Sequence, residues 1–326
     1  MSYHSAPSLK RKKRIIFLVG PTATGKSAIG VILAKKINAE IISCDSMQIY
    51  KGMDILTSMP GPVLRKKVSH HLIRYQSPGR EYNVSRYRDQ ASRKIKEILG
   101  RGRVPLFVGG TGHYMSIMLD GIFKAKAQNK ALRNRLYKIA EKKGNIFLYR
   151  KLKKIDPQSA AKIHPNDTKR IIRALEVFQV TGKPISELQK QRKGLWQDYD
   201  VRIFCLNMPR EELYQRINKR VNKMFAQGLI REVEKLLKNK LSRTASYAIG
   251  LREIKGYLAG AYGLEEAKRL VKRNTRAYAK RQLTWFREDK RIEWIETTCK
   301  EKPASVAQRI CNIISVSYTH LTLPTN

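Results

Sequence analysis

Residues 20–27 of the chain are Gly20-Pro21-Thr22-Ala23-Thr24-Gly25-Lys26-Ser27. This is the G-x-x-x-x-G-K-[ST] pattern of a phosphate-binding loop. An apolar run at 15–19 predicts a buried strand before the loop, and the spacing of apolar residues at 26–37 predicts a helix after it. Backbone N–H groups of such a loop, with a helix N-terminus behind them, bind phosphate or diphosphate. Lys26 would neutralise the anion and the Ser27 hydroxyl would ligate Mg²⁺. The residues expected to hold the anion are Gly20, Thr22, Ala23, Thr24, Gly25, Lys26 and Ser27.

The charge of the chain points to a polyanionic partner. Among its 326 residues, 67 are Lys or Arg and 26 are Asp or Glu, a formal net charge of +41. Nucleic acid is the first candidate, and the alternative is a proteome-wide lysine bias such as an AT-rich genome produces.

The four cysteines are scattered and form no C-x-x-C pair, so they predict neither a zinc site nor a disulfide framework and fit a reducing compartment. No apolar run is long enough to span a bilayer. We therefore expect a cytoplasmic protein without a membrane partner.

Short apolar runs alternate with helical patterns in the first third of the chain. Strands are predicted at 15–20, 40–44 and 104–108, and helices at 26–37 and 84–99. This alternation is typical of an α/β fold, here a P-loop NTPase-like parallel sheet flanked by helices. A second glycine turn, Gly109-Gly110-Thr111-Gly112, follows the 104–108 strand at the edge where open α/β sheets bind ligands.

Four segments are predicted along the chain: a first part of the core at 1–127, a basic all-helical insertion at 128–196, a second and mostly helical part of the core at 197–314, and a disordered or non-native tail at 315–326. Between Lys130 and Lys193 the insertion has 18 Lys or Arg against 5 Asp or Glu and no strand-like run. The second part of the core begins with a strand at 201–208 and includes a long basic helix at 264–287. The tail has no charged residue, so we exclude it from the functional argument.

Two polar residues follow predicted strands directly. Asp45 comes after the 40–44 strand, where three roles are open: a metal ligand, a base that takes a proton from an acceptor, or the N-cap of the next helix. Thr111 would present its hydroxyl at the same sheet edge, or cap the helix that follows it.

Further candidates are basic. Arg216, Arg220 and Lys223 share one helix face, which is either solvated or directs a guanidinium at a diphosphate, where bidentate geometry favours Arg. His70 and His71 would point to opposite faces of a strand, so we expect a structural role or a substrate contact and no shared metal ion.

Eight blocks of the chain, taken in order, resemble the tRNA dimethylallyltransferases (isopentenyl-tRNA transferases). They are residues 20–27, 45–52, 70–73, 109–114, 156–157, 166–177, 248–250 and 278–287. Several ordered blocks between about residue 14 and residue 295 are far more specific than the phosphate loop alone.

The resemblance implies transfer of a dimethylallyl group from dimethylallyl diphosphate to the N6 amine of the adenosine just 3′ of a tRNA anticodon, with Mg²⁺ as cofactor. It implies that Asp45 is the base, that Thr111 assists near the amine, and that Lys26 and Arg220 contact the diphosphate. A monomer that binds the anticodon stem-loop is expected. Contacts with tRNA are implied for Asp45, Ser46, Met47, Gln48, Thr111, Arg133, Lys169, Arg170, Ile171, Ile172, Arg173, Ala245, Ser246, Tyr247, Ala248, Ile249 and Gly250.

Three positions depart from the family pattern. Arg74 and Asn222 each stand where the family usually has Asp, and His113 stands where it usually has Leu. These departures leave the phosphate loop and Asp45 intact. They leave undecided whether this chain forms the family's salt bridges at these positions and binds Mg²⁺ and the acceptor in the same way.

Three other activities share parts of the pattern. Prenylation of free AMP, ADP or ATP would use the same loop and Asp45, but a mononucleotide needs no extended positive surface. A P-loop small-molecule kinase would instead bind ATP and turn over its γ-phosphate. A non-catalytic RNA-binding module is disfavoured because Lys26, Ser27 and Asp45 are all intact.

Overall fold

The computed structural model describes residues 12–123 and 129–319, which form two compact units. The first unit contains the chain up to Met118 together with the chain from Asp198 onward, and the second is Leu119–Gln197. The sequence predicted the insertion at 128–196, so the second unit begins nine residues earlier than expected; residues 124–128 lie outside the described part.

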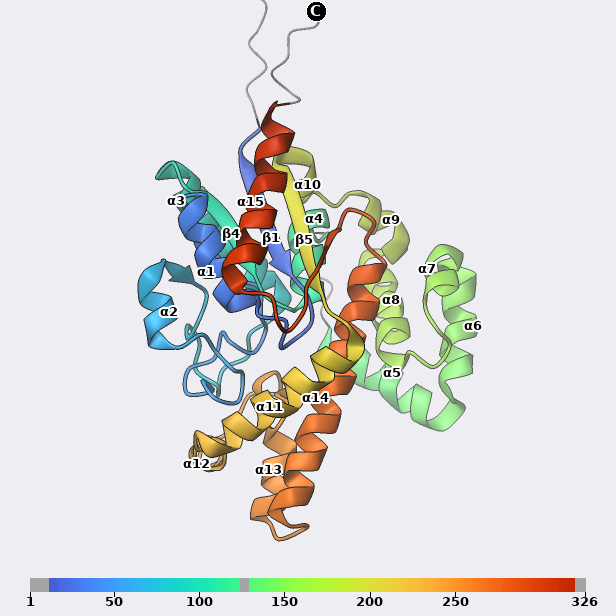
Figure 1. Cartoon of the computed structure of the whole chain (residues 1–326). Helices are drawn as coiled ribbons and strands as arrows, with labels where there is room; N and C mark the ends of the chain where they lie inside the picture. Colours follow the sequence, from blue (N-terminus) through green and yellow to red (C-terminus); the bar gives the residue numbers. More distant parts are fainter. Residues whose placement is uncertain (1–11, 124–128, 320–326) are drawn as a thin grey trace, which may run out of the picture. The chain divides into compact units, whose positions relative to one another are not determined.

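A six-stranded parallel sheet is the centre of the first unit (Figure 1). Its order is β3-β2-β4-β1-β5-β6, and β1 is hydrogen-bonded to β4 on one side and to β5 on the other. The strands are β1 (Arg14–Val19), β2 (Ala39–Ser43), β3 (His70–His71), β4 (Val104–Val108), β5 (Asp200–Asn207) and β6 (Glu293–Glu296). Because all strands are parallel, their C-terminal ends meet at one edge, where the phosphate loop and the second glycine turn also lie.

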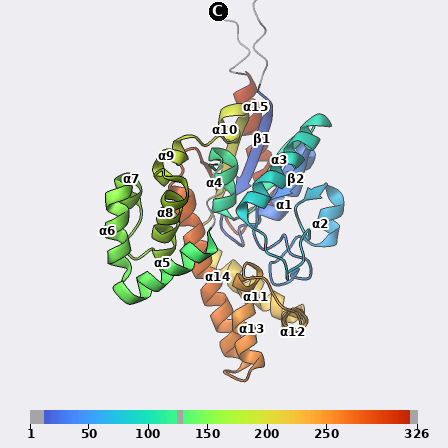
Figure 2. The same ribbon diagram turned by 180° about the vertical axis from the view of Figure 1, so that it is seen from behind.

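Helices cover both faces of this sheet. On one face α1 (Lys26–Lys36) and α15 (Pro303–Thr319) pack on Ile16 and Leu18 of β1 (Figure 1). Seen from behind, α3 (Val84–Gly100) and α4 (Gly112–Asp120) cover the other face (Figure 2). All residues of β1 after Arg14 are buried, which explains its continuous apolar sequence, as expected for a parallel strand enclosed on both sides.

Below the sheet edge in Figure 1, the first unit continues as helices. They are α11 (Arg210–Ala226), α12 (Leu229–Leu237), α13 (Leu251–Leu258) and α14 (Leu264–Arg287), with a short 3₁₀ turn at Ala245–Tyr247. The short helix α2 (Pro62–Lys67) lies at the side of the sheet, next to α1 (Figure 1). The apolar stripes of α11 and α14 form a small core around Ile217 and Val271, and Ala23 of the phosphate loop packs against it. The loop is therefore in contact with helices that follow it by about 190 residues or more.

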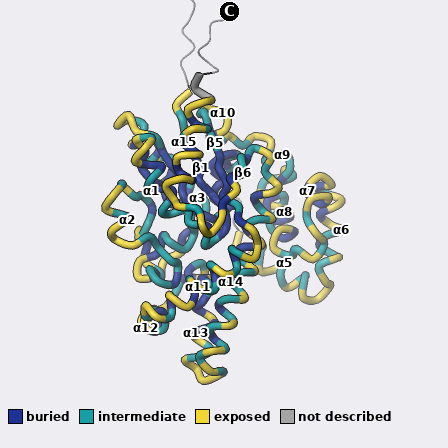
Figure 3. The backbone as a smooth tube through the Cα atoms, in the orientation of Figure 1, coloured by how far each residue is buried: buried dark blue, intermediate teal, exposed yellow. Residues whose placement is uncertain are grey.

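The second unit contains helices and no strand among its described residues. Its helices are α5 (Lys130–Lys143), α6 (Asn145–Ile155), α7 (Pro157–Lys162), α8 (Thr168–Thr181), α9 (Ile185–Lys190) and, at its end, α10 (Leu195–Asp198). A core of its own, around Leu148 and Leu175, holds these helices together. In the chain as a whole, buried residues are concentrated in the strands and on the sides of the helices that face a core, whereas the outer sides and the ends of the helices are more exposed (Figure 3).

Two expectations about the C-terminal part need correction. The strand β6 was not predicted; it has only four residues, and β5 pairs with it in parallel. The tail was predicted at 315–326 as disordered or non-native; residues 315–319 are helical, since they continue α15, which buries Val306, Ile310 and Ile314 against the sheet. Residues 320–326 lie outside the described part, and no described helix is long and apolar enough to cross a membrane.

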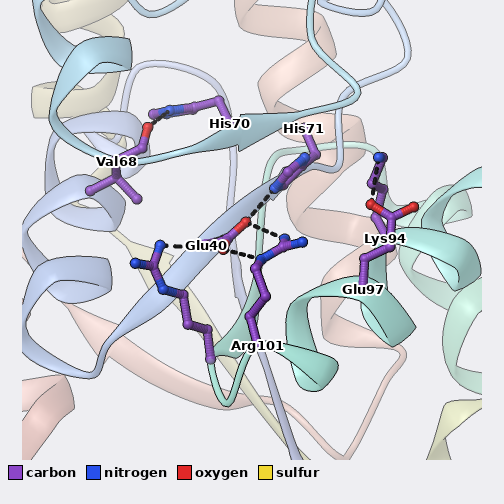
Figure 4. Close-up of polar contacts among 8 residues, drawn as sticks. Glu40, Val68, His70, His71, Lys94, Glu97 and Arg101 are labelled. Atoms are coloured by element: carbon purple, nitrogen blue, oxygen red, sulfur yellow. Dashed lines mark hydrogen bonds and ion pairs between the residues drawn. The ribbon is translucent and has the colours of Figure 1, made fainter.

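At the N-terminal end of β2, Glu40 is almost fully buried and holds three basic side chains (Figure 4). Its carboxylate accepts hydrogen bonds from Arg101 at 3.0 and 2.9 Å, from Arg103 at 3.3 Å and contacts His71 Nε2 at 2.6 Å. Burial raises the pKa of Glu40, but the hydrogen bonds from Arg101 and His71 outweigh it and lower that pKa to about 2. His71 thus has a structural role, whereas His70, whose Nδ1 contacts the Val68 carbonyl, also lines a pocket of the first unit.

Replacing this carboxylate should weaken the fold. Glu40→Gln leaves the arginines without a buried anion and is expected to lower the free energy of unfolding by about 3 kcal/mol at pH 7. Because the folded pKa lies below the ordinary 4.5, the stabilisation is present above pH 4.5 and disappears as the pH falls towards 2. Urea unfolding at several pH values measures this, with the exposed Glu97→Gln as control; equal unfolding curves for the two variants at pH 7 would contradict the prediction.

Candidate functional site

The phosphate loop joins β1 to α1 and has an unusual backbone. Gly20 and Gly25 have φ values of 140° and 91°, and Ala23 is also left-handed at 70°. A side chain at Gly20 would place its Cβ 2.7 Å from the Leu206 carbonyl oxygen, so only glycine fits there. Thr24 is buried and its hydroxyl donates to the Pro21 carbonyl at 2.9 Å, which braces the turn from inside.

The N–H groups of residues 23–27 make no hydrogen bond to the described chain. Two of them, those of Lys26 and Ser27, belong to the first turn of α1, where the helix dipole adds partial positive charge. Five consecutive N–H groups at a helix N-terminus are suited to an anion.

Two cations reinforce the loop. Arg220 of α11 donates from Nη1 to the Thr22 hydroxyl at 2.8 Å, and Lys26 Nζ donates to the Pro21 carbonyl. Burial and, to a smaller extent, the neighbouring Arg220 lower the pKa of the Lys26 amine to about 7, while Asp45 opposes the shift. Burial also lowers the pKa of Arg220. Arg216 and Lys223 were predicted on the same face of α11 as Arg220. Arg216 approaches the loop, because a Cβ added to Gly25 would lie 3.4 Å from its Nη2. Lys223 is exposed.

Asp45 shapes the turn that follows β2. Its Oδ1 accepts the backbone N–H groups of Met47 at 2.9 Å and Gln48 at 3.3 Å. Thr111 braces the same turn, because its Oγ1 accepts the Ser46 N–H at 3.0 Å and lies 3.4 Å from the Ser46 hydroxyl. The predicted N-cap role of Asp45 is therefore wrong, because residues 46–49 form a turn and the next helix, α2, begins only at Pro62; Asp45 stabilises this turn through one carboxylate oxygen.

One pocket of about 640 Å³ connects these parts of the first unit. One side is formed by Thr22, Ala23 and Gly25–Ser27 of the loop, with Arg220, and the other by Asp45–Gln48. Tyr247, Ala248 and Ile249 add a wall in which Tyr247 is 55 % exposed. Ser27 and Asp45 both line the pocket, and no cluster of three or more His, Cys, Asp or Glu exists among the described residues, so a metal ion there would need oxygens of a bound ligand in addition to these side chains.

Two residues of this site were not predicted from the sequence. Gln282 of α14 lines the pocket and accepts the Thr22 N–H. Glu232 of α12 accepts the N–H groups of Ile55 and Leu56 at 2.9 and 2.8 Å, and so holds the 55–59 segment, part of which forms the pocket wall. Gln282 lies in a block that carries the family resemblance, but no local pattern shows which atoms either side chain contacts.

Loosening that wall should impair ligand binding. Glu232→Gln keeps one acceptor oxygen and loses one of the two hydrogen bonds from the backbone of Ile55 and Leu56, which costs about 1 kcal/mol. We therefore expect the KM for the ligand of the phosphate loop to rise roughly five-fold, with little change in RNA affinity. The control is Glu234→Gln, an exposed carboxylate on the same helix. Steady-state kinetics measures the effect, and an unchanged KM would show that the wall does not need Glu232.

The remaining predicted contacts lie in two places. Arg133 and Arg173 belong to the second unit, where both donate to the fully buried Glu176, at 2.7 and 2.8 Å. Lys169 and Arg170 of the same unit are exposed. In the first unit Ser246 is exposed, and Gly250 is left-handed with φ 99° and donates its N–H to Glu253.

Three of the residues expected to touch RNA need correction. The side chains of Ile171, Ile172 and Ala245 are at most 1 % exposed. Ile171 and Ile172 belong to the core of the second unit, because the inner face of α8 carries them. These three residues support their segments and cannot meet a ligand through their side chains.

The three residues that depart from the family pattern all lie outside the pocket. Arg74 forms an ion pair with Asp54, with Nε 3.3 Å from Oδ1, and its backbone is left-handed with φ 48°. Asn222 is exposed on α11, and His113 lies edge-on to Trp285 with 6.0 Å between ring centroids. None of the three lines the pocket.

The parallel sheet, the loop and the helix behind it define a P-loop α/β protein. The family model "IPP transferase" matches residues 48–289, and the model "Isopentenyl transferase" matches residues 13–69. The chain therefore belongs to the IPP transferase family.

Similar proteins agree with this assignment over nearly the whole chain. A protein from Carboxydothermus hydrogenoformans named tRNA dimethylallyltransferase is 48 % identical over 91 % of this chain and 96 % of its own. The crystal structure of a tRNA isopentenylpyrophosphate transferase from Bacillus halodurans is 39 % identical, covers 94 % of this chain and 96 % of its own, and has a TM-score of 0.69. A eukaryotic dimethylallyltransferase, solved acting on tRNA, has a TM-score of 0.80 at 30 % identity and covers 96 % of this chain and 81 % of its own.

Proposed function

We propose that this protein transfers a dimethylallyl group from dimethylallyl diphosphate to the N6 amine of the tRNA adenosine immediately 3′ of the anticodon. The products are N6-isopentenyladenosine and diphosphate. The observation that carries the proposal is the single pocket that joins the phosphate loop and Arg220 to the Asp45–Gln48 turn. The names of the similar proteins support the same reaction.

The donor diphosphate would bind the five free N–H groups of residues 23–27. Charge builds on the diphosphate as the allylic C–O bond breaks, and the bonding electron pair leaves with it. Lys26 and Arg220, both at the loop, would stabilise that charge in a site of low dielectric. Mg²⁺ held by the Ser27 hydroxyl and the diphosphate would supply further neutralisation.

The acceptor amine would meet Asp45. The N6 lone pair is delocalised into adenine, which makes the amine a weak nucleophile. As N6 forms its bond to C1 of the dimethylallyl group, its proton would pass to Oδ2 of Asp45, because Oδ1 already accepts two backbone N–H groups. Thr111 would keep the turn in place through Ser46.

The RNA itself would be held by basic side chains of the second unit and by an aromatic side chain in the wall of the pocket. Lys169, Arg170 and the arginines on Glu176 in the second unit are suited to phosphate contacts, which orient an anticodon stem. The exposed Tyr247 ring would stack on an unpaired base.

We further propose that the protein acts as a cytoplasmic monomer.

A competition between acceptors tests the proposal. Purified protein with dimethylallyl diphosphate and Mg²⁺ is offered an anticodon stem-loop with an A-rich loop and, in parallel, AMP. Prenylation of the stem-loop alone is expected. Prenylation of AMP alone would indicate an adenylate prenyltransferase, and ATP turnover without prenylation would indicate a kinase.

A further inference from the structure

The pocket wall of residues 247–249 ends at Gly250, a position whose backbone favours glycine. Gly250 is left-handed with φ 99°, and a Cβ on it would lie 2.8 Å from Cδ1 of Leu56. Leu56 lines the same pocket, so the 247–249 wall and the 55–59 segment come into close contact there. A shift of the backbone at Gly250 would therefore change the shape of the pocket on this side.

Glu253, the third residue of α13, holds this glycine in place. Its Oε2 accepts the Gly250 N–H at 2.9 Å, and its Oε1 accepts a hydrogen bond from Nδ2 of Asn274 on α14. The Tyr262 hydroxyl donates to the Glu253 carbonyl at 2.6 Å and so supports the helix turn that carries the carboxylate. Glu253 is only 7 % exposed, and a buried N–H without an acceptor is costly. The carboxylate thus ties the end of the 247–249 wall to α14.

The 247–249 wall lies at the opening of the pocket, because Tyr247 lines the pocket and is nevertheless more than half exposed. Under the proposed function, the target adenosine reaches the Asp45 turn inside this pocket. The two nucleotides next to it would then lie nearer the opening, where the Tyr247 ring is. Unpaired bases of an RNA loop stack on aromatic side chains, so the wall is suited to the base next to the target adenosine.

We propose that Glu253 is a positioning residue for the acceptor RNA. Through the Gly250 N–H it keeps the 247–249 wall in the conformation that binds the base next to the target adenosine. Glu253 does not itself line the pocket, so it acts on the RNA only through this wall. The inference rests on the proposed function, because it assumes that an RNA adenosine enters the pocket.

RNA loops that lack one base test the inference. At saturating dimethylallyl diphosphate, kcat/KM is measured for an anticodon stem-loop with an A-rich loop and for two versions of it, with an abasic site on the 5′ or the 3′ side of the target adenosine. In the native protein the intact loop should be preferred about tenfold over one of the abasic loops, as expected for one base stacked on an aromatic ring. This preference should fall to about two-fold in Glu253→Ala. It should stay close to native in Glu253→Gln, whose amide oxygen can still accept the Gly250 N–H.

Tyr247→Ala shows whether the preference depends on the wall. It should lower the preference as far as Glu253→Ala does, and the double variant should lower it no further, because both changes remove the same contact. The KM for the diphosphate donor should remain within about two-fold of native in Glu253→Ala. Glu265→Ala, which removes an exposed carboxylate at the start of α14, is the control and should keep the native preference.

The preference is a ratio of two rates for one protein sample, so it does not depend on the fraction of folded protein. If Glu253→Ala does not fold, Asn274→Ala decides, since it removes the partner of the carboxylate on α14 and should lower the preference to about four-fold. A native preference in the deciding variant, or a native protein that is indifferent to both neighbouring bases, would overturn the inference alone. Failure of the native protein to prenylate the intact loop would instead overturn the proposed function.

Discussion

Asp45→Asn is expected to reduce the transfer rate about a thousand-fold while leaving RNA affinity within about two-fold of the native value. General-base groups contribute roughly 10²–10⁴ to rates, and an amide cannot accept the proton of N6. Asparagine retains an oxygen that can accept the Met47 and Gln48 N–H groups, so the turn should persist. Single-turnover prenylation of a stem-loop and its binding by gel shift measure the two quantities.

Asp45→Ala provides the comparison that separates the two roles of the carboxylate. It removes the base and also the acceptor of two backbone N–H groups, so it should lose RNA affinity or stability in addition to rate. Asp89→Asn, an exposed position on α3, controls for the loss of a negative charge. An Asp45→Asn protein that prenylates at the native rate would exclude Asp45 as the base.

The central fold could be predicted because each of its elements carries its own local pattern. The strand before the phosphate loop is continuously apolar, as burial on both faces requires. The helix Leu264–Arg287 has the bounds that its pattern predicts, since it is long and one stripe of it, with Val271 and Ala279, faces a core. The α/β class and parallel sheet are thus confirmed.

The errors arose where composition competes with packing. The missing charges from residue 315 onward suggested a disordered or non-native tail, yet α15, whose Val306, Ile310 and Ile314 repeat at a helical spacing and pack on the sheet, continues to Thr319. Strand β6 consists of Glu293–Glu296, and four residues on the edge of a sheet are too few for a periodic signal. Burial of Ile171 and Ile172 follows from the helical period of α8, which a motif comparison does not consider.

The site was predictable as a set of loops but not as a set of contacts. Motifs identify Lys26, Asp45 and Thr111 because each belongs to the segment that joins a strand to the next element, and parallel strands end at one edge. The partners that hold these loops are distant in sequence: Gln282 is 260 residues from Thr22, and Glu232 is 177 from Ile55. Such pairs depend on how α11, α12 and α14 fold back onto the sheet edge, for which one sequence has no local signal.

Lys26→Met is expected to lower kcat/KM for the diphosphate donor about 10²- to 10³-fold, the usual cost of removing one group that stabilises developing charge. Methionine keeps the length and apolar stem of lysine, so the loop should retain its conformation, which Thr24 and Gly20 support independently. Affinity for RNA should remain close to native. Steady-state kinetics with the donor varied measures the loss, and a normal kcat/KM would show that the diphosphate is not at this loop.

The pH dependence of donor binding should reveal Lys26 directly. The pKa of its amine is about 7 in the ligand-free protein, and a bound diphosphate should raise it because an adjacent anion favours the charged form. Below pH 7 the Lys26 amine is already charged, so it supports donor binding fully. Between pH 7 and 9 the free protein must take up a proton when the donor binds, so donor affinity should fall up to about tenfold per pH unit. At pH 8 this uptake should be nearly one proton per donor bound. Diphosphate ionisation changes little there, since phosphate groups titrate near pH 6. Calorimetry in buffers of different ionisation enthalpy measures the uptake, and Lys26→Met should show none; a flat affinity and no proton uptake in the native protein would mean that Lys26 is charged before the donor arrives.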